Sequence, residues 1–198
     1  MLVKDPKYYI WKTRLLSIVN PKRMHNFDSH IAGKSVLDIG CGPSPSFYSF
    51  GTAKTVVGID NSIVFIHHSR SLAEKNPSFQ NNYFYINGEA QNLPFKDGQF
   101  QVGIFVFALH HIPVNHNLLI KEAVRCCSEK IIIIDHVQDE KGLRRIIKYL
   151  WWKLADRGVQ YNTYAEWKKL LKSYKIAYED ITGFPLYNVY NAIISLKG

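Results

Sequence analysis

The strongest constraint on the fold is an alternation of short apolar segments with segments of helical character. The apolar segments are SVLDIG (35–40), TVVGID (55–60), NYFYIN (82–87), QVGIFVFAL (101–109) and KIIIID (130–135). They are rich in β-branched or aromatic residues and mostly apolar on both faces, which is typical of strands covered by helices on either side. The helix candidates between them are residues 46–51, residues 62–75 with Ser62 as N-cap, and residues 115–127. β-α units in series predict a parallel, doubly wound sheet.

The pattern changes after Asp135. Apolar residues then recur at helical spacing, at Leu143, Ile146, Ile147, Leu150, Trp151 and Leu154. Three basic residues, Arg144, Arg145 and Lys148, fall largely off that stripe. This arrangement predicts an amphipathic basic helix.

The last part of the chain completes the sheet. A capping-box pattern from Thr163 to Glu166 opens another helix, which would direct Trp167, Leu170 and Leu171 inward. KIAYEDITGF and YNVYNAIISLK then read as two more strands, joined at GFP. We therefore expect an α/β fold with a Rossmann-like, doubly wound, seven-stranded sheet, mostly parallel with an antiparallel last strand and helices on both faces. The expected single domain, 1–198, comprises an N-terminal helical lid (1–30), a cofactor-binding core (34–135), a basic helical insert or lid (138–175) and a C-terminal strand pair (175–198).

Composition and charge narrow the class of protein. A chain of 198 residues is long enough to bury a substantial core, and its longest apolar stretch, near residues 102–109, is too short to cross a bilayer. Charges interrupt the apolar residues of the N-terminus, which makes it a poor signal peptide, and the three cysteines show neither metal-ligand nor disulfide spacing. We therefore expect a cytoplasmic protein. The net charge of +9 is concentrated in residues 141–175, a segment that contains ten Lys or Arg residues and only two acidic residues.

The turn after the first predicted strand reads VLDIGCG, residues 36–42. Gly40 and Gly42 would let a ligand approach the backbone without meeting a Cβ, although a tight turn would also call for glycine. Pro45 stands where a dinucleotide-binding pattern has its last glycine, and Asp38 lies two residues before the turn. A fixed negative charge there disfavours a diphosphate and suits a ligand with cationic groups, such as an amino acid carrying an ammonium and a sulfonium.

Two more acids are expected at the same sheet edge, where open α/β sheets bind ligands. Asp60 ends the second strand, a usual place for a carboxylate that accepts hydrogen bonds from ribose hydroxyls. Glu89 follows the third strand, where it could accept from an adenine amino group while the Ala90 N–H meets a ring nitrogen. Each acid alone is more often a solvated residue at a strand end, but three at successive strand ends favour a binding site.

The segments VLDIGCG, VVGIDNS, GEAQNLPF and FALHHI resemble the successive motifs of class I S-adenosylmethionine-dependent methyltransferases, in particular the small-molecule enzymes that include those of quinone and sterol biosynthesis. The resemblance covers roughly residues 34–135. It implies S-adenosylmethionine as cofactor, with contacts to methionine from Asp38, Gly40, Cys41, Gly42 and Phe107, to ribose from Asp60 and Asn61, and to adenine from Glu89 and Ala90. Two positions depart from the family pattern: Ser44 replaces a frequent third glycine, and Gln101 replaces a common Asp.

Methyl transfer from a sulfonium requires alignment of the acceptor atom, the methyl carbon and sulfur in a dry pocket, and a base only where the acceptor must lose a proton. No metal or covalent intermediate is needed. His111 and His136, which follow the fourth and fifth strands, are the candidate bases, whereas His110 is interpreted as a hydrogen-bonded structural histidine. Aromatic residues could close over the site or simply belong to the core: Tyr8, Tyr9, Trp11, Trp151, Trp152, Tyr161 and Tyr164.

The sequence leaves the identity of the methyl acceptor open. The first hypothesis is a small molecule, which could be anionic or lipid-like. A nucleic-acid methyltransferase is supported by the charge but lacks the Asp/Asn-Pro-Pro-Tyr/Phe motif after the fourth strand. A protein that binds S-adenosylmethionine without turnover is a third hypothesis, and a nicotinamide dehydrogenase is disfavoured by Pro45. The basic amphipathic helix is also compatible with an anionic membrane surface. The sequence does not determine the oligomeric state.

Overall fold

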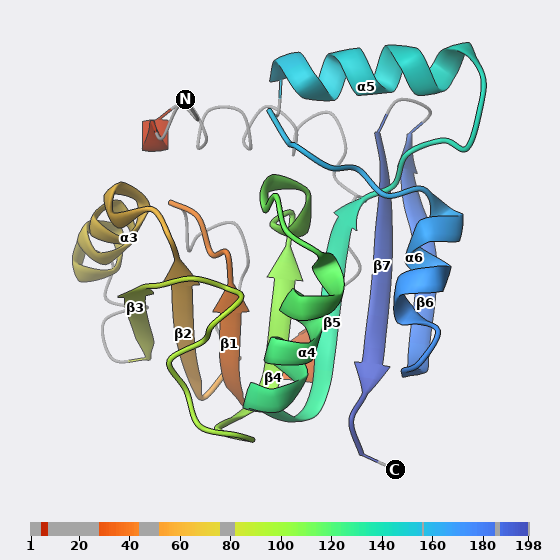
Figure 1. Ribbon diagram of the computed structural model, residues 1–198. Helices are drawn as coiled ribbons and strands as arrows, with labels where there is room; N and C mark the ends of the chain where they lie inside the picture. Colours follow the sequence, from red (N-terminus) through yellow and green to blue (C-terminus); the bar gives the residue numbers. More distant parts are fainter. Residues whose placement is uncertain are drawn as a thin grey trace.

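A seven-stranded sheet in the order β3-β2-β1-β4-β5-β7-β6 forms the centre of the computed structural model (Figure 1). The structure describes residues 5–7, 28–43, 52–75, 82–155, 157–184 and 187–197. The strands are β1 (Ser35–Ile39), β2 (Thr55–Asp60), β3 (Tyr83–Asn87), β4 (Phe100–Val106), β5 (Cys127–His136), β6 (Lys175–Phe184) and β7 (Tyr187–Ser195). β1 to β5 pair in parallel, and β7 is antiparallel to both β5 and β6. The predicted fold class is confirmed.

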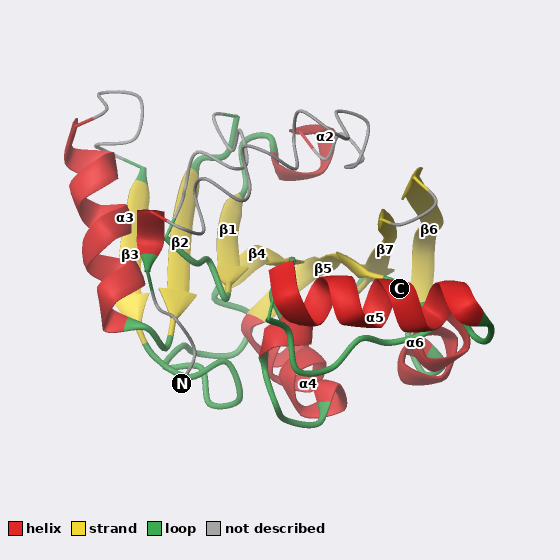
Figure 2. Cartoon of the chain, turned by 90° about the horizontal axis from the view of Figure 1, so that it is seen from above, coloured by secondary structure: helices red, strands yellow, loops and turns green. Residues whose placement is uncertain are grey.

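Helices cover both faces of this sheet. They are α2 (Asp28–Ile31), α3 (Ile63–Lys75), the short 3-10 helix η2 (Leu109–His111), α4 (His116–Cys126), α5 (Leu143–Ala155) and α6 (Tyr164–Leu171). One apolar core cluster joins the sheet to α4 and α6, and the other joins the opposite face to α2 and α3. Figure 2 shows α4 and α6 on one side of the sheet and α2 on the other. α5 belongs to neither layer and lies at the edge of the sheet where the parallel strands end, beyond β4, β5 and β7 (Figure 1).

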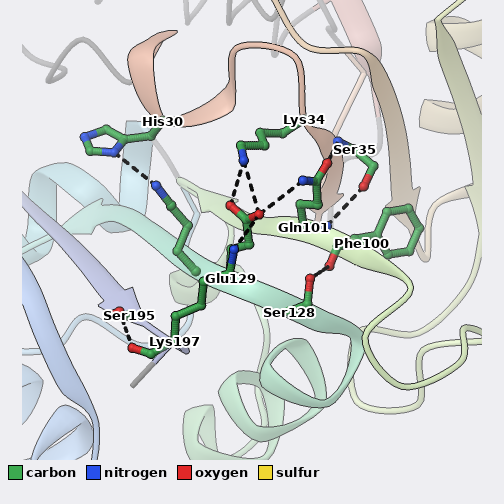
Figure 3. Close-up of polar contacts among 10 residues, drawn as sticks. His30, Lys34, Ser35, Phe100, Gln101, Ser128, Glu129, Ser195 and Lys197 are labelled. Carbon is green, nitrogen blue, oxygen red and sulfur yellow. Dashed lines mark hydrogen bonds and ion pairs between the residues drawn. The ribbon is translucent and has the colours of Figure 1, made fainter.

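Polar contacts tie the strands together at the opposite, amino-terminal edge of the parallel strands (Figure 3). Glu129 of β5 forms ion pairs of 2.9 Å with Lys34 and with Lys197, and it accepts a hydrogen bond from the Gln101 side chain at 3.1 Å. Gln101 also accepts from the backbone N–H of Ser35 at 3.1 Å. Lys197 and Lys34 lower the pKa of Glu129 to about 2. Gln101, where the family commonly has an acid, therefore connects β1, β4 and β5 far from the predicted site.

Most predicted elements are present, with adjusted ends. The helices expected at 62–75 and 115–127 are α3 and α4, and their N-cap side chains, Ser62 and Asn115, accept from the backbone N–H groups of Phe65 and Asn117 at 3.4 and 2.9 Å. The helix predicted at 46–51 lies outside the described residues. The prediction that the fourth strand runs to residue 109 is wrong: β4 ends at Val106 because the next residues turn into η2.

The predicted amphipathic helix is α5. Lys148, which the spacing places largely off the apolar stripe, is fully buried, whereas the apolar stripe is exposed. Among the described residues, no helix combines the length and apolar character needed to traverse a bilayer.

Candidate functional site

The turn after β1 is held by the acid that ends β2. Both carboxylate oxygens of Asp60 accept backbone hydrogen bonds, one from the N–H of Gly42 at 3.0 Å and the other from that of Ser62 at 2.8 Å. On the other side, the Ser69 hydroxyl of α3 donates to the Gly42 carbonyl at 3.0 Å. The acid predicted to bind ribose therefore also fixes the shape of the glycine turn.

The two glycines of this turn are needed for different reasons. Both have positive φ, +72° at Gly40 and +62° at Gly42, a region that other residues occupy only with strain. A Cβ on Gly40 would lie 2.7 Å from the Cβ of Ala108, so Gly40 lets the turn pack against the segment that follows β4. At Gly42, no atom of the described residues lies within 4 Å of the corresponding position. Of the two glycines, Gly42 is the one whose Cβ position meets no described side chain.

Asp38 lies next to Asp60 on one face of the sheet. The parallel register pairs Asp38 with Gly58, and because side chains alternate along a strand, Asp38, Gly58 and Asp60 share a face. Asp38 is only 5% exposed. Burial, and secondarily the charge of Asp60, raises the pKa of Asp38 to about 7. A carboxyl group in this state is stabilised as an anion when a cationic group approaches it.

Cys41 packs over Gly58. A Cβ on Gly58 would lie 3.0 Å from both the Cys41 sulfur and the Tyr85 ring, so the glycine leaves the space that the thiol occupies. Burial, with the negative charges of Asp38 and Asp60, raises the pKa of Cys41 well above its ordinary value. The thiol is therefore neutral and suited to lining the site rather than to nucleophilic attack.

The segment after β3 joins the same edge of the sheet. The Gly88 N–H donates to the Asp60 carbonyl at 3.1 Å, which ties the ends of β2 and β3 together. Glu89 and Asn61 are exposed here, and Ala90 is half-buried. The structure thus brings Asp38, Cys41, Gly42 and Asp60 into one cluster, with the predicted adenine-binding residues at the strand end beside it.

Phe107 leaves β4 in a left-handed backbone conformation, with φ at +51°. Such a conformation is costly for a residue with a side chain and is often found at functional sites. Its backbone N–H donates to the Ile134 carbonyl at 2.8 Å, and its ring centre lies 5.2 Å from that of His136. Two residues predicted to face the methyl-transfer region are therefore in contact.

A buried histidine–aspartate pair lies behind these residues. Nδ1 of His110 is 2.5 Å from Oδ1 of Asp135, and both side chains are almost fully buried. Burial alone would raise the pKa of Asp135, but the charge of His110 and its hydrogen bond, with a smaller contribution from His136, outweigh burial and lower that pKa. His110 is hydrogen-bonded, as interpreted from the sequence. Asp135 was not predicted as a site residue; the only sequence signal was its place at the end of a buried strand.

The two candidate bases have different surroundings. His136 is 1% exposed, and its ring packs against those of Phe107, His110, Trp152 and Tyr161. His111 is half-buried, with its ring centre 4.0 Å from that of His110. His111 is therefore the more accessible of the two.

The aromatic residues predicted as a lid divide into two groups. Trp152 is fully buried with its ring 4.7 Å from His136, and the Tyr161 hydroxyl donates to the Trp152 carbonyl at 3.2 Å. Trp151 and Tyr164 are exposed. Tyr8, Tyr9 and Trp11 lie outside the described residues. Trp152 and Tyr161 thus form a wall around His136. The sequence alone does not show which of the adjacent residues Trp151 and Trp152 faces the interior.

Comparison with known proteins accounts for this arrangement. The family described as "Methyltransferase domain" matches residues 36–130, a range that holds the glycine turn, the three acids and both histidines after β4. An uncharacterized methyltransferase of Bacillus subtilis, YcgJ, is 24% identical over 82% of this chain. The match over residues 36–130 and this relative support a class I S-adenosylmethionine-dependent methyltransferase. A demethylmenaquinone methyltransferase of Staphylococcus saprophyticus is a further relative, 23% identical over 57% of this chain. The chain spans 65% of the length of YcgJ and 44% of the staphylococcal protein.

Solved structures share the fold of this chain at low identity. The crystal structure of YcgJ is 14% identical, with a TM-score of 0.71 and coverage of 96% of this chain and 99% of that chain. Magnesium protoporphyrin IX methyltransferase from Synechocystis with bound SAH gives a TM-score of 0.66 at 16% identity, over 96% of this chain and 83% of that one. The cyclase SpnF also matches, with a TM-score of 0.69 at 15% identity, over 92% and 80%. The same fold thus occurs in a protein named for a different reaction.

Proposed function

We propose that this chain binds S-adenosylmethionine at the carboxyl edge of β1 to β3 and transfers its methyl group to a small-molecule acceptor. One observation carries the proposal: the paired acids Asp38 and Asp60 lie beside the backbone of Gly42, which no described side chain covers. The match of residues 36–130 to a methyltransferase domain supports the same interpretation.

The residues present fit this cofactor. The carboxyl group of Asp38 would hold the cationic methionine end, because its raised pKa gives it the most to gain from a positive charge. The carboxylate of Asp60, which accepts from the backbone N–H groups of Gly42 and Ser62, would also accept hydrogen bonds from the ribose hydroxyls. Glu89 and Ala90 would receive the adenine, and Cys41 would line the pocket as a neutral thiol.

When bound, the cofactor supplies a methyl group activated by a positively charged sulfur. The chain's own task is to position the acceptor and exclude water from it. Phe107, Trp152 and Tyr161 provide apolar walls near this end of the site. His111 is our candidate for accepting a proton from the acceptor, because it is accessible, whereas the enclosed His136 would orient its neighbours.

A nucleic-acid acceptor is the second candidate function, favoured by the basic segment 141–175. A protein that binds the cofactor without transferring its methyl group is the third, and the match to a cyclase shows that this fold is not tied to one reaction.

A methyl-release assay with labelled S-adenosylmethionine tests the proposal. The full chain is incubated with a panel of small-molecule acceptors and, separately, with RNA over a series of salt concentrations. Release with a small molecule supports the proposal. Release with RNA alone, with the steep salt dependence of phosphate contacts, would favour the second candidate. Cofactor binding without release from any acceptor would favour the third.

A further inference from the structure

The outer face of α5 is apolar and exposed to solvent. We define this face by its side chains: Leu143, Ile146, Ile147, Leu150, Trp151 and Leu154, which are between 46% and 77% exposed. Soluble proteins normally turn such a stripe toward their core. Here the stripe points away from it, and α5 lies at the outside of the molecule (Figure 1).

The opposite side of α5 explains this orientation. Lys148 and Trp152 are both fully buried. The Lys148 ammonium lies 3.2 Å from the Asp139 carboxylate and donates to the Val137 carbonyl at 3.4 Å, while the Trp152 ring stacks on His136. These contacts fix which way the helix faces, so the apolar stripe cannot turn inward without separating the buried Lys148 from Asp139.

The charged side chains of α5 itself are all positive, while Asp139 and Glu140 lie just before the helix. Its sequence, LRRIIKYLWWKLA, contains no acid. Arg144 and Arg145 are exposed, with Arg144 in an ion pair of 3.2 Å with Asp139, and Lys141 is exposed just before the helix. The Lys153 ammonium lies over the ring of Tyr149, 5.6 Å from the ring centre. An apolar stripe bordered by basic and aromatic residues is the pattern of helices that lie in the interface of anionic membranes.

We propose that the outer face of α5 docks flat on an anionic phospholipid bilayer. The apolar side chains would enter the boundary between headgroups and acyl chains, and the bordering cations would contact lipid phosphates. A second copy of this chain fits less well, because pairing two such helices would bring two basic segments together in a protein of net charge +9. Docking would turn the carboxyl edge of the sheet toward the bilayer, and it does not depend on methyl transfer.

Co-sedimentation with vesicles tests the proposal, using phosphatidylcholine alone and phosphatidylcholine mixed with phosphatidylglycerol. We expect the full chain to pellet with the mixed vesicles, less so as salt is raised. The decisive variant is Leu150→Glu on α5. Its matched control is Leu118→Glu on α4, because the two leucines are equally exposed, at 55%. Both variants should keep the thermal melting temperature of the wild type.

Leu150→Glu should reduce the partition coefficient by about tenfold or more, since it removes a leucine from the apolar contact and adds a negative charge, and Leu118→Glu by less than about twofold. Equal pelleting with neutral vesicles, equal loss in both variants, or no pelleting of the wild type would overturn the proposal. A wild-type dimer that Leu150→Glu converts to a monomer, without vesicle binding, would assign this face to a second copy.

Discussion

The carboxylate of Asp60, at the end of β2, accepts a hydrogen bond of 3.0 Å from the backbone of Gly42, in the turn after β1. The same residue contributes to the raised pKa of Asp38, so one acid shapes the turn and tunes its neighbour. The two functions meet at the edge of the sheet where parallel strands end, which is where α/β folds bind their ligands.

Alanine substitutions should separate the roles of the two glycines in this turn. Both Gly40→Ala and Gly42→Ala place a side chain at positive φ, which costs about 1–2 kcal/mol of unfolding free energy. Gly40→Ala should lose about 1–3 kcal/mol more, because its Cβ meets Ala108. Urea denaturation measures both values. Equal losses in the two variants would contradict the assigned packing role of Gly40.

Cofactor binding should depend on pH through Asp38. Because the pKa of Asp38 is about 7 in the folded chain, a cationic ligand that needs the carboxylate must displace a proton below that pH. Affinity for S-adenosylmethionine should therefore rise about tenfold per pH unit over the range below about pH 7 and then level off. Calorimetry in buffers of different ionisation enthalpy measures the released proton.

Asp38→Asn provides the control for this pH dependence. It should bind more weakly and with an affinity that is flat over the same range. The raised pKa also means that Asp38 reduces stability as pH rises from about 4 to 7, since the unfolded chain loses this proton first. Asp38→Asn should therefore be more stable than the wild type at pH 7. A wild-type affinity that does not change with pH would show that Asp38 does not contact the ligand.

The buried pair of His110 and Asp135 should contribute to stability as well as to the site. Asp135→Asn leaves His110 without its carboxylate, and breaking a buried pair in this way costs about 3–5 kcal/mol. The folded-state pKa of Asp135 is lowered, so its contribution is present above the unfolded pKa and is lost as pH falls through the folded value. The gap between wild type and variant should narrow in acid.

Thermal unfolding at neutral and acidic pH tests this prediction. The control is Asp97→Asn, which removes an exposed acid paired with Arg125 and should cost no more than about 1 kcal/mol. If Asp135→Asn were as stable as Asp97→Asn at neutral pH, the pair would not have the role assigned to it.

The apolar pattern of the sequence predicts the sheet and most helices of this protein, but not the end of β4 or the orientation of α5. Strand alternation and apolar periodicity predict the sheet and most helices, because burial acts on every residue of those elements. The end of β4 was missed because the left-handed conformation of Phe107 has no signature in residue type. The orientation of α5 could not be predicted, because periodicity shows that an apolar stripe exists but not which side of the helix the protein covers. That side depends on the contacts of Lys148 with Asp139 and of Trp152 with His136.

The candidate site likewise has features that the sequence predicts and features that only the structure shows. The acids at successive strand ends could be placed together from topology, since parallel strands end at one edge. The pairing of Asp135 with His110 could not, because it depends on how η2 folds back over β5. The reason for Gly40, close packing against Ala108, likewise requires coordinates.

Calorimetric titration with S-adenosylmethionine tests the central claim most directly, comparing wild type, Asp60→Asn and the exposed-acid control Glu74→Gln. We predict one binding site in the wild type and in Glu74→Gln, and affinity lower by about tenfold or more in Asp60→Asn, because an amide cannot accept both backbone hydrogen bonds and carries no charge. Absence of binding to the wild type, or unchanged affinity in Asp60→Asn, would contradict the account.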